Sequence, residues 1–275
     1  MDRSTRRGFY ETLSAAINDI TEHGFDQAGR IEYWTMMLRE AAERAATPVW
    51  RMEEMLRAGL SAIYRRLVDR GGIARYHPGV ARFTLQRIAP HLRAELDRRI
   101  LASANLIKLN RQQAIAKTLQ RFQGWSTSIP AGGSDATGKR ESSRNIRKAL
   151  ASLPFEDRRV LIDQGHKLNA SINAVVAQQG SAIAITWKSH WRQAGYDYRE
   201  DHKERDGKVY AIRGSWALAG GLMKAGVAGY YEDITAVGEE INCRCYAEYI
   251  YSLRNLPVDM LTKKGIEELS HVHGA

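Results

Sequence analysis

The residues of this chain with the most distinctive chemistry lie close together in its C-terminal third. The only two cysteines, Cys243 and Cys245, are separated by one residue, and His202 and the pair Asp206-Gly207 lie upstream of them. Thiolate sulfur and imidazole nitrogen are ligands that zinc prefers in proteins. The composition of this region therefore indicates either a metal site or a structural cluster built from His202, Cys243 and Cys245.

A zinc site built on these three residues lacks an obvious fourth ligand. Structural zinc usually has four protein ligands, and Asp197, Asp206 and His190 are the nearby candidates. Cysteines at i and i+2 of a strand share a face, so both thiols are expected to point the same way. They can equally be small buried residues of a core strand. The sequence thus leaves zinc as a candidate cofactor and indicates no other.

The motifs of several common enzyme classes are missing. An H-x-E triplet begins at His202, but the P-C-x-x-C of zinc deaminases does not follow it. The chain also has no H-E-x-x-H, no G-x-S-x-G and no Walker loop. A metal-dependent nuclease that uses Asp197, Asp201, His202 and Asp206 around a divalent ion remains an alternative. The mixed-charge run that contains these residues is also typical of a solvated loop.

Most of the chain that precedes these residues has helical periodicity. Apolar residues recur at spacings of three and four at Phe9, Leu13, Ala16, Ile17 and Ile20, which places them on one helix face. Further helices are expected at 27–46, 47–70, 91–122, 143–153 and 155–179. The sequence therefore predicts long helices over the N-terminal two thirds.

The helical periodicity of the sequence ends near residue 180. Short, partly β-branched segments at 182–187 and 243–251 predict strands, and Asp206-Gly207 predicts a hairpin turn. The predicted fold class is α+β and predominantly α, with a long-helix N-terminal part followed by a small α+β C-terminal domain. Residues 1–123 are expected to form a basic helical arm or bundle, 124–141 a linker rich in Gly, Ser, Thr and Pro, 142–180 connecting helices, and 181–275 the small domain.

The positive charge of the chain is concentrated in its middle. The net charge is +10 overall and +13 between residues 61 and 150, whereas residues 1–60 carry −2 and residues 151–275 carry −1. Such a band suits a phosphate backbone or an acidic protein surface, and it suits a solvated helix face equally well. The candidate contact residues for nucleic acid or a protein partner are Arg93, Arg98, Arg99, Lys108, Arg111, Lys117 and Arg121.

The sequence gives no indication of export or of a disulfide-built scaffold. No apolar run approaches the roughly 18 residues that span a bilayer, and the first residues lack the apolar core of a signal peptide. Two cysteines in 275 residues are too few for a disulfide framework. A cytoplasmic product without a membrane partner is expected.

An ordered set of residues runs through 185–250: a tryptophan, then D-x-R-x-x-H, an Asp-Gly turn, a Gly-rich loop, and E-I-N-C-R-C. This order resembles the C-terminal domain of the phage head morphogenesis family typified by the Mu F minor head protein. Its signature positions in this chain are Trp191, Asp197, Arg199, His202, Asp206, Gly207, Asn242, Cys243, Arg244 and Cys245. The residues before the N-C-R-C motif depart from the Pro-Gly-Asp turn of many members, which indicates a divergent branch.

The resemblance implies a minor structural protein of the virion, located in the capsid interior or at the portal vertex and present in multiple copies. Its expected partners are the portal protein and other virion proteins, with packaged double-stranded DNA as a further candidate, and its expected role is head assembly with DNA packaging or ejection. No catalytic activity is implied. We expect the signature positions to maintain the fold, with Asp197 paired to Arg199 and Asn242 satisfying backbone groups. The alternatives are the nuclease above and a non-specific DNA-binding protein.

Overall fold

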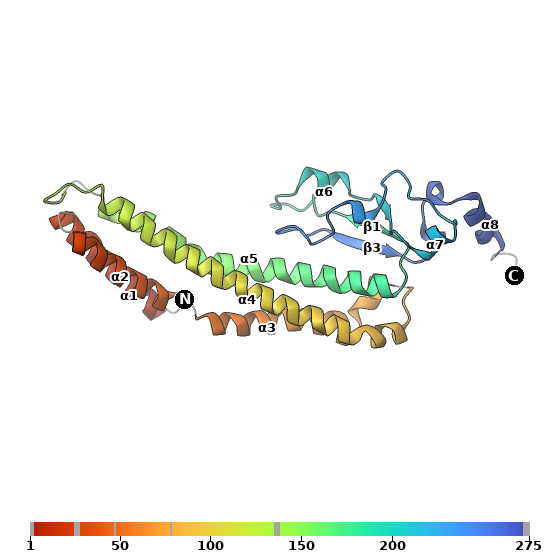
Figure 1. The fold of residues 1–275 in the computed structure, drawn as a ribbon, viewed down its shortest axis with the longest axis horizontal. Coiled ribbons are helices and arrows are strands. Elements are labelled where there is room, and N and C mark those ends of the chain that lie inside the picture. Colours follow the sequence, from red (N-terminus) through yellow and green to blue (C-terminus); the bar gives the residue numbers. More distant parts are fainter. Residues whose placement is uncertain (1–2, 25–27, 47, 78, 135–137, 272–275) are drawn as a thin grey trace. The chain divides into compact units, whose positions relative to one another are not determined.

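The computed structural model describes residues 3–24, 28–46, 48–77, 79–134 and 138–271. Helices dominate these residues, and a small antiparallel sheet lies in the C-terminal part of the chain (Figure 1). The fold is α+β and predominantly α, which confirms the class predicted from the sequence. Across the described part of the chain, no helix combines the length and the apolar character that crossing a membrane requires.

Long helices make up the first two thirds of the chain. They are α1 (Arg3–His23), α2 (Ala28–Ala45), α3 (Val49–Tyr64), α4 (Arg82–Ser126) and α5 (Lys139–Gln179). A π-helical turn at Arg65–Asp69 and a 3-10 turn at Gly72–Arg75 lie between α3 and α4. The C-terminal elements are shorter, and they are β1 (Ala184–Lys188), α6 (Glu200–Glu204), β2 (Val209–Ala211), α7 (Trp216–Ala219), β3 (Tyr246–Ile250) and α8 (Lys263–His271).

The chain divides into two compact units, which group it differently from the ranges predicted above. Unit 1 comprises Met1–Arg57 and Leu101–Leu161, and unit 2 comprises Ala58–Ile100 and Ile162–Ala275. The expected linker at 124–141 lies inside unit 1. Its described part is fixed there because Ile129 is buried in the core and Ser134 donates its backbone N–H to the carbonyl of Thr21 at 2.8 Å. Residues 135–137 of that range lie outside the described residues.

The core of unit 1 is built by the predicted apolar stripes. The side chains of Phe9, Leu13 and Ile20 on α1 are buried against α2 and against Phe122 and Ile146 of the long helices. A second apolar cluster of this unit joins Met52 and Leu56 of α3 to Ile107 and Val160. The spacing of three and four residues therefore identified the buried face of α1 correctly.

The two longest helices extend further than the sequence predicts, because each continues through a proline. Pro90 lies inside α4 and Pro154 inside α5, although proline removes one helical hydrogen bond and disfavours the helix interior. Ile88 and Leu92 on either side of Pro90 are buried in one apolar cluster of unit 2. Packing of an apolar face contributes more to helix stability than local propensity does, so the expected breaks at residues 90 and 154 are wrong.

The sheet of unit 2 has the strand order β2-β1-β3, and both pairings are antiparallel. Ile185 in the central strand lies opposite Tyr210 of β2 and Tyr249 of β3. These three side chains belong to a cluster that includes Ala177 of α5 and both cysteines, whereas Ala184 belongs to a second cluster. Because successive strand residues point to opposite faces, the sheet has a buried layer on each side, and the cysteines lie in the layer that contains α5.

Two local predictions around the site need correction. The strand predicted at 243–251 begins only at Tyr246, so both cysteines precede β3. The pair Asp206-Gly207 forms a turn, in which the backbone N–H of Lys208 donates to the carbonyl of Arg205 at 3.0 Å, but the turn joins α6 to β2 and is not a hairpin. A five-residue helix replaces the first strand of the expected hairpin, which puts His202 on a helix.

Two glycines with positive φ provide a matched test of the packing around the site. Gly207 has φ of +78° and open space where a Cβ would be, whereas a Cβ on Gly238, with φ of +76°, would lie 2.8 Å from the Cβ of Ala170 on α5. We expect Gly207→Ala to lower the free energy of unfolding by about 1–2 kcal/mol through backbone strain alone. Gly238→Ala should cost about 1–3 kcal/mol more because it also overpacks the core.

Urea denaturation monitored by circular dichroism measures both variants. Equal destabilisation would show that the loop at Gly238 is not held against α5.

Candidate functional site

The structure brings the three predicted metal-binding residues together. His202 on α6 is 2% exposed, and Cys243 and Cys245 are 1% and 6% exposed. The imidazole Nδ1 lies 3.7 Å from the sulfur of Cys243 and 3.4 Å from that of Cys245. The ligand atoms of the three residues all lie within 4.8 Å of one another, and both cysteines are free thiols.

The second ring nitrogen of His202 faces a carboxylate that the sequence analysis did not single out as a site residue. Nε2 lies 3.2 Å from Oε2 of Glu240, and the same oxygen forms an ion pair with Nε of Arg199 at 2.7 Å. Arg199 also donates from Nη2 to the backbone carbonyl of Ile241 at 3.0 Å. Arg199 therefore pairs with Glu240, and the expected pair with Asp197 is wrong.

Local sequence explains how α6 presents His202. Glu200 and Asp201 occupy the first turn of α6, where acidic residues stabilise the positive end of the helix dipole. Trp187 of β1 contacts the His202 ring edge-on, with ring centroids 5.4 Å apart and planes at 70°. The guanidinium of Arg205 in turn lies over the Trp187 ring, 5.1 Å from its centroid. The edge-on contact with Trp187, which Arg205 covers in turn, therefore helps to fix the orientation of the imidazole.

The loop that carries the cysteines is fixed by a residue of α5. Asn242 has φ of +60°, a conformation that asparagine adopts more readily than most residues. Its backbone N–H donates to Oδ1 of Asp163 at 2.6 Å. The hydroxyl of Tyr196 donates to the carbonyl of Asn242 at 3.3 Å and accepts from the backbone N–H of Arg244 at 3.2 Å. Asp163 and Tyr196 were missed from sequence because their roles depend on contacts between residues more than 40 positions apart.

The two thiols are electrostatically unequal. The pKa of Cys243 is lowered to about 6, chiefly because the thiol of Cys245 donates a hydrogen bond to its sulfur, with further donation from the backbone N–H groups of Gly238 and Cys245. The pKa of Cys245 is raised because Cys243 holds its proton and because burial disfavours a second thiolate. The pair therefore holds one proton between two sulfurs, beside an imidazole.

Asp206 fixes the segment that follows β1. Its Oδ1 accepts the backbone N–H of Ser189 at 2.8 Å, and its Oδ2 accepts Nε1–H of Trp191 at 2.9 Å. The hydrogen bond from Ser189 is the main cause of a lowered pKa at Asp206, and that from Trp191 adds to it. The signature positions Trp191 and Asp206 are thus joined to each other. Neither belongs to the group formed by His202, Cys243 and Cys245, which we call the thiol–imidazole group.

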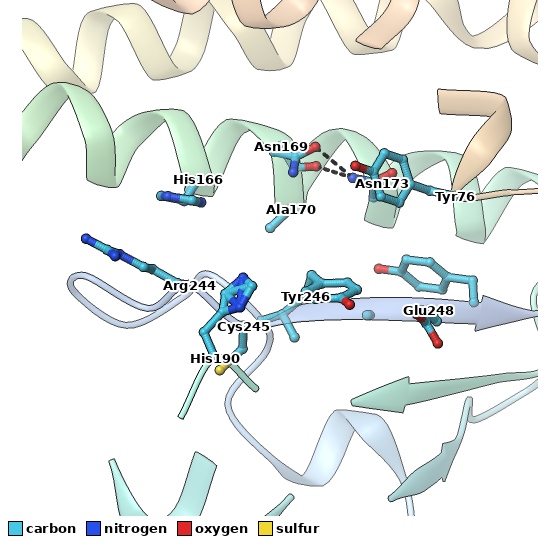
Figure 2. A pocket seen from close by; sticks show the side chains of 13 residues that line it. Tyr76, His166, Asn169, Ala170, Asn173, His190, Arg244, Cys245, Tyr246 and Glu248 are labelled. Atoms are coloured by element: carbon cyan, nitrogen blue, oxygen red, sulfur yellow. Dashed lines mark hydrogen bonds between the residues drawn. The ribbon is translucent and has the colours of Figure 1, made fainter. Parts of the chain in front are cut away.

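A pocket of about 600 Å³ lies beside this group, between α5 and the segment that enters β3 (Figure 2). Cys245, His190 and Arg244 line it from one side, and His166 and Asn169 line it from α5. The pKa of His166 is lowered, first by burial and then by the positive charge of Arg244. Of His202, Cys243 and Cys245, it is Cys245 that lines this pocket.

The carboxylates of the alternative nuclease site do not form a metal-binding cluster among the described residues. Asp201 forms an ion pair with Arg205 at 2.7 Å, and both oxygens of Asp206 are engaged as described above. Among the residues that the structure describes, His202, Cys243 and Cys245 are the group with metal-like spacing, and Asp197 is not part of it. The predicted fourth ligands Asp197, Asp206 and His190 are likewise outside that group.

The basic residues of α4 that were candidates for contact with nucleic acid or a protein partner differ in how far their charges are exposed and unpaired. Arg111 is 5% exposed and forms an ion pair with Asp157 at 3.2 Å inside unit 1, so its expected place on the surface is wrong. A carboxylate buried without a partner would be costly, and Arg111 supplies the opposite charge for Asp157. Within unit 2, Arg93 pairs with Asp97, and Arg98 and Arg99 both pair with Glu95.

The remaining candidates belong to unit 1. Lys108 and Lys117 are exposed, and Arg121 donates to the backbone carbonyl of Asn145.

Comparisons of the chain with family models, with curated proteins and with solved structures found no match.

Replacing Asp206 distinguishes a structural carboxylate from a catalytic one. We expect Asp206→Ala to lower the free energy of unfolding at pH 7 by about 1–3 kcal/mol, because two donors lose a charged acceptor. Asp206→Asn, which keeps one acceptor oxygen, should lose less. Since the folded pKa of Asp206 is lowered, its stabilisation is complete above the unfolded pKa of about 3.9 and is lost as the pH falls further.

Urea denaturation between pH 7 and pH 3 measures these differences, which should shrink below about pH 4. A variant that is as stable as the wild type, yet loses Mg²⁺- or Mn²⁺-dependent DNA cleavage, would instead support the nuclease.

Proposed function

We propose that the chain is a minor structural protein of a phage head, and that unit 2 contains a head morphogenesis domain similar to that of the Mu F family. One observation carries the proposal. Most of the residues that make the sequence resemble this family are linked directly, or through one residue, into a connected set of contacts. His202 contacts both cysteines, Arg199 reaches the loop before Asn242, and Trp191 binds Asp206.

These contacts favour an architectural role over catalysis for the signature positions. The polar side chains at His202, Arg199 and Asp206 are directed at other protein groups. A catalytic carboxylate or base needs a free position near a substrate, and Asp206 has both oxygens occupied by Ser189 and Trp191. A domain held together in this way suits a protein whose task is to occupy a fixed place in an assembly.

Unit 1 offers the surface that we propose for docking on the portal protein. It exposes large apolar side chains, and these are Tyr33, Met36, Trp50, Met55, Leu101, Leu106, Leu109 and Phe155. Leu101 and Leu109 on α4 are 66% and 54% exposed and lie two turns apart on one side of the helix. Aromatic residues and methionine are enriched in the cores of protein interfaces. Lys108 and Lys117 add positive charge for an acidic partner or for packaged DNA.

Affinity capture tests this function directly. The full chain, carrying an affinity tag, is co-expressed with the portal protein encoded in the same genome and captured from the lysate. We expect the wild type to retain the portal protein, and we expect the double variant Leu101→Glu/Leu109→Glu to retain at least about tenfold less. That factor corresponds to about 1.4 kcal/mol, which two truncated interface contacts commonly exceed.

The matched control is Val227→Glu/Val258→Glu, which adds the same charge at apolar residues of unit 2 that are 100% and 75% exposed. This control should retain the portal protein as the wild type does. Failure of the wild type to capture the portal protein would contradict the proposal, and equal loss in both double variants would remove α4 from the interface.

A further inference from the structure

We propose that His202, Cys243 and Cys245 bind one zinc ion through Nδ1 and the two sulfurs, with a water molecule as the fourth ligand. The site goes beyond the proposed function, since neither head assembly nor portal binding requires a metal. Its role would be to fasten α6 to the loop that leads into β3. The inference rests on the geometry of the ligand atoms, on the groups that surround them, and on the chemistry of the donor set.

The distances between the ligand atoms already suit tetrahedral zinc. Zinc binds thiolate sulfur at about 2.3 Å and imidazole nitrogen at about 2.0–2.1 Å, so a tetrahedral ion separates the two by about 3.6 Å. The Nδ1 of His202 lies 3.7 Å from the sulfur of Cys243 and 3.4 Å from that of Cys245. The three ligand atoms all lie within 4.8 Å of one another, so an ion can be placed between them once the side chains adjust.

The second ring nitrogen of His202 lies near a carboxylate, the kind of group that metal-bound histidines commonly face. A histidine that binds a metal through one nitrogen commonly directs the other at a carboxylate, which fixes the tautomer and increases the basicity of the ligand. The Oε2 of Glu240 lies 3.2 Å from Nε2, and Arg199 holds this carboxylate in place at 2.7 Å. A proton on Nε2, the nitrogen nearest this carboxylate, would leave Nδ1, the atom that faces the two sulfurs, with its lone pair free.

Backbone amides surround the sulfurs and can carry part of the charge of a zinc–dithiolate group. The N–H groups of Gly238 and Cys245 donate to the sulfur of Cys243, and that of His190 donates to the sulfur of Cys245. Two neighbouring thiolates in a buried cluster otherwise repel each other. A divalent cation bound between the two sulfurs would offset this repulsion.

The donor set selects the class of metal. Two sulfurs and one imidazole favour zinc over magnesium and calcium, which bind oxygen ligands. The nearby carboxylates do not compete, because Asp206 is held by Ser189 and Trp191, and Glu240 lies on the far ring nitrogen of His202. Zinc is therefore the expected occupant.

The fourth ligand comes from the pocket. Cys245 and His190 both line the pocket of about 600 Å³ in Figure 2, which is the solvent-sized space beside the site from which a water ligand would come. The ring of His190 packs against Tyr246, with centroids 5.7 Å apart, and His190 is not in the group of ligand atoms. Three protein ligands with a water in the fourth position is a common arrangement for zinc.

Zinc content measured on the purified full chain tests the site. The protein is produced with a histidine-free tag, reduced, supplied with zinc, passed through gel filtration and analysed by inductively coupled plasma mass spectrometry. We expect about one zinc per chain in the wild type, as a single ligand set requires, and at least a tenfold loss in Cys243→Ser and in Cys245→Ser. The matched control His190→Asn should keep the wild-type content, because a water molecule supplies the fourth ligand.

Cobalt supplies a readout that does not depend on the folding of the variants. Titration of the reduced wild type with Co²⁺ should produce the absorption of a tetrahedral thiolate complex and saturate at about one equivalent. A wild type that retains less than about a tenth of an equivalent of zinc and shows no thiolate–cobalt absorption would overturn the proposal. Unchanged zinc content in Cys245→Ser would also overturn it, as would loss of zinc in a folded His190→Asn. None of these outcomes bears on capture of the portal protein.

Discussion

The arrangement of unit 2 depends on satisfying one buried imidazole. His202 is almost fully removed from solvent, and a buried polar group without partners costs free energy comparable to a lost hydrogen bond. Its Nδ1 faces two thiols 41 and 43 residues further along the chain, and its Nε2 lies 3.2 Å from the carboxylate of Glu240 in the same loop. The short helix α6 and the loop at 238–245 must therefore meet.

Helix α5 provides a second set of long-range connections within unit 2. Asp163 binds the backbone of Asn242, and Asn173 binds Nε2 of the buried His77 at 2.9 Å. His77 also stacks on Tyr249 of β3, with ring centroids 5.1 Å apart, and burial lowers its pKa. A neutral histidine can donate from one nitrogen and accept at the other, which suits a position between an amide and tyrosine side chains. Thus α5 is fixed to the loop before β3 through Asp163 and to β3 through His77, in addition to its apolar face.

The sequence predicted those features that depend on local pattern. The buried face of α1 follows from apolar spacing, and the grouping of His202 with the two cysteines was expected because metal-ligand residue types are concentrated in one stretch of the chain. The continuation of α4 through Pro90 could not be predicted, because it depends on packing by residues such as Leu168 and Ile172 of α5. The pairing of Arg199 with Glu240 was likewise inaccessible, since several acidic residues lie nearer to it in sequence. The hairpin at Asp206-Gly207 failed because the Asp-Gly signal specifies a turn but not the elements on either side of it.

Hydrogen exchange measured by mass spectrometry tests most directly whether His202 holds these segments together. In His202→Ala, we expect amide protection to fall together in α6, in residues 238–245 and at the start of β3, while unit 1 keeps the protection of the wild type. The control His166→Ala, at a histidine of α5 that lines the pocket but is not in the group of His202, Cys243 and Cys245, should leave all of these segments unchanged. An increase in exchange that is confined to α6 would contradict the central role of the imidazole.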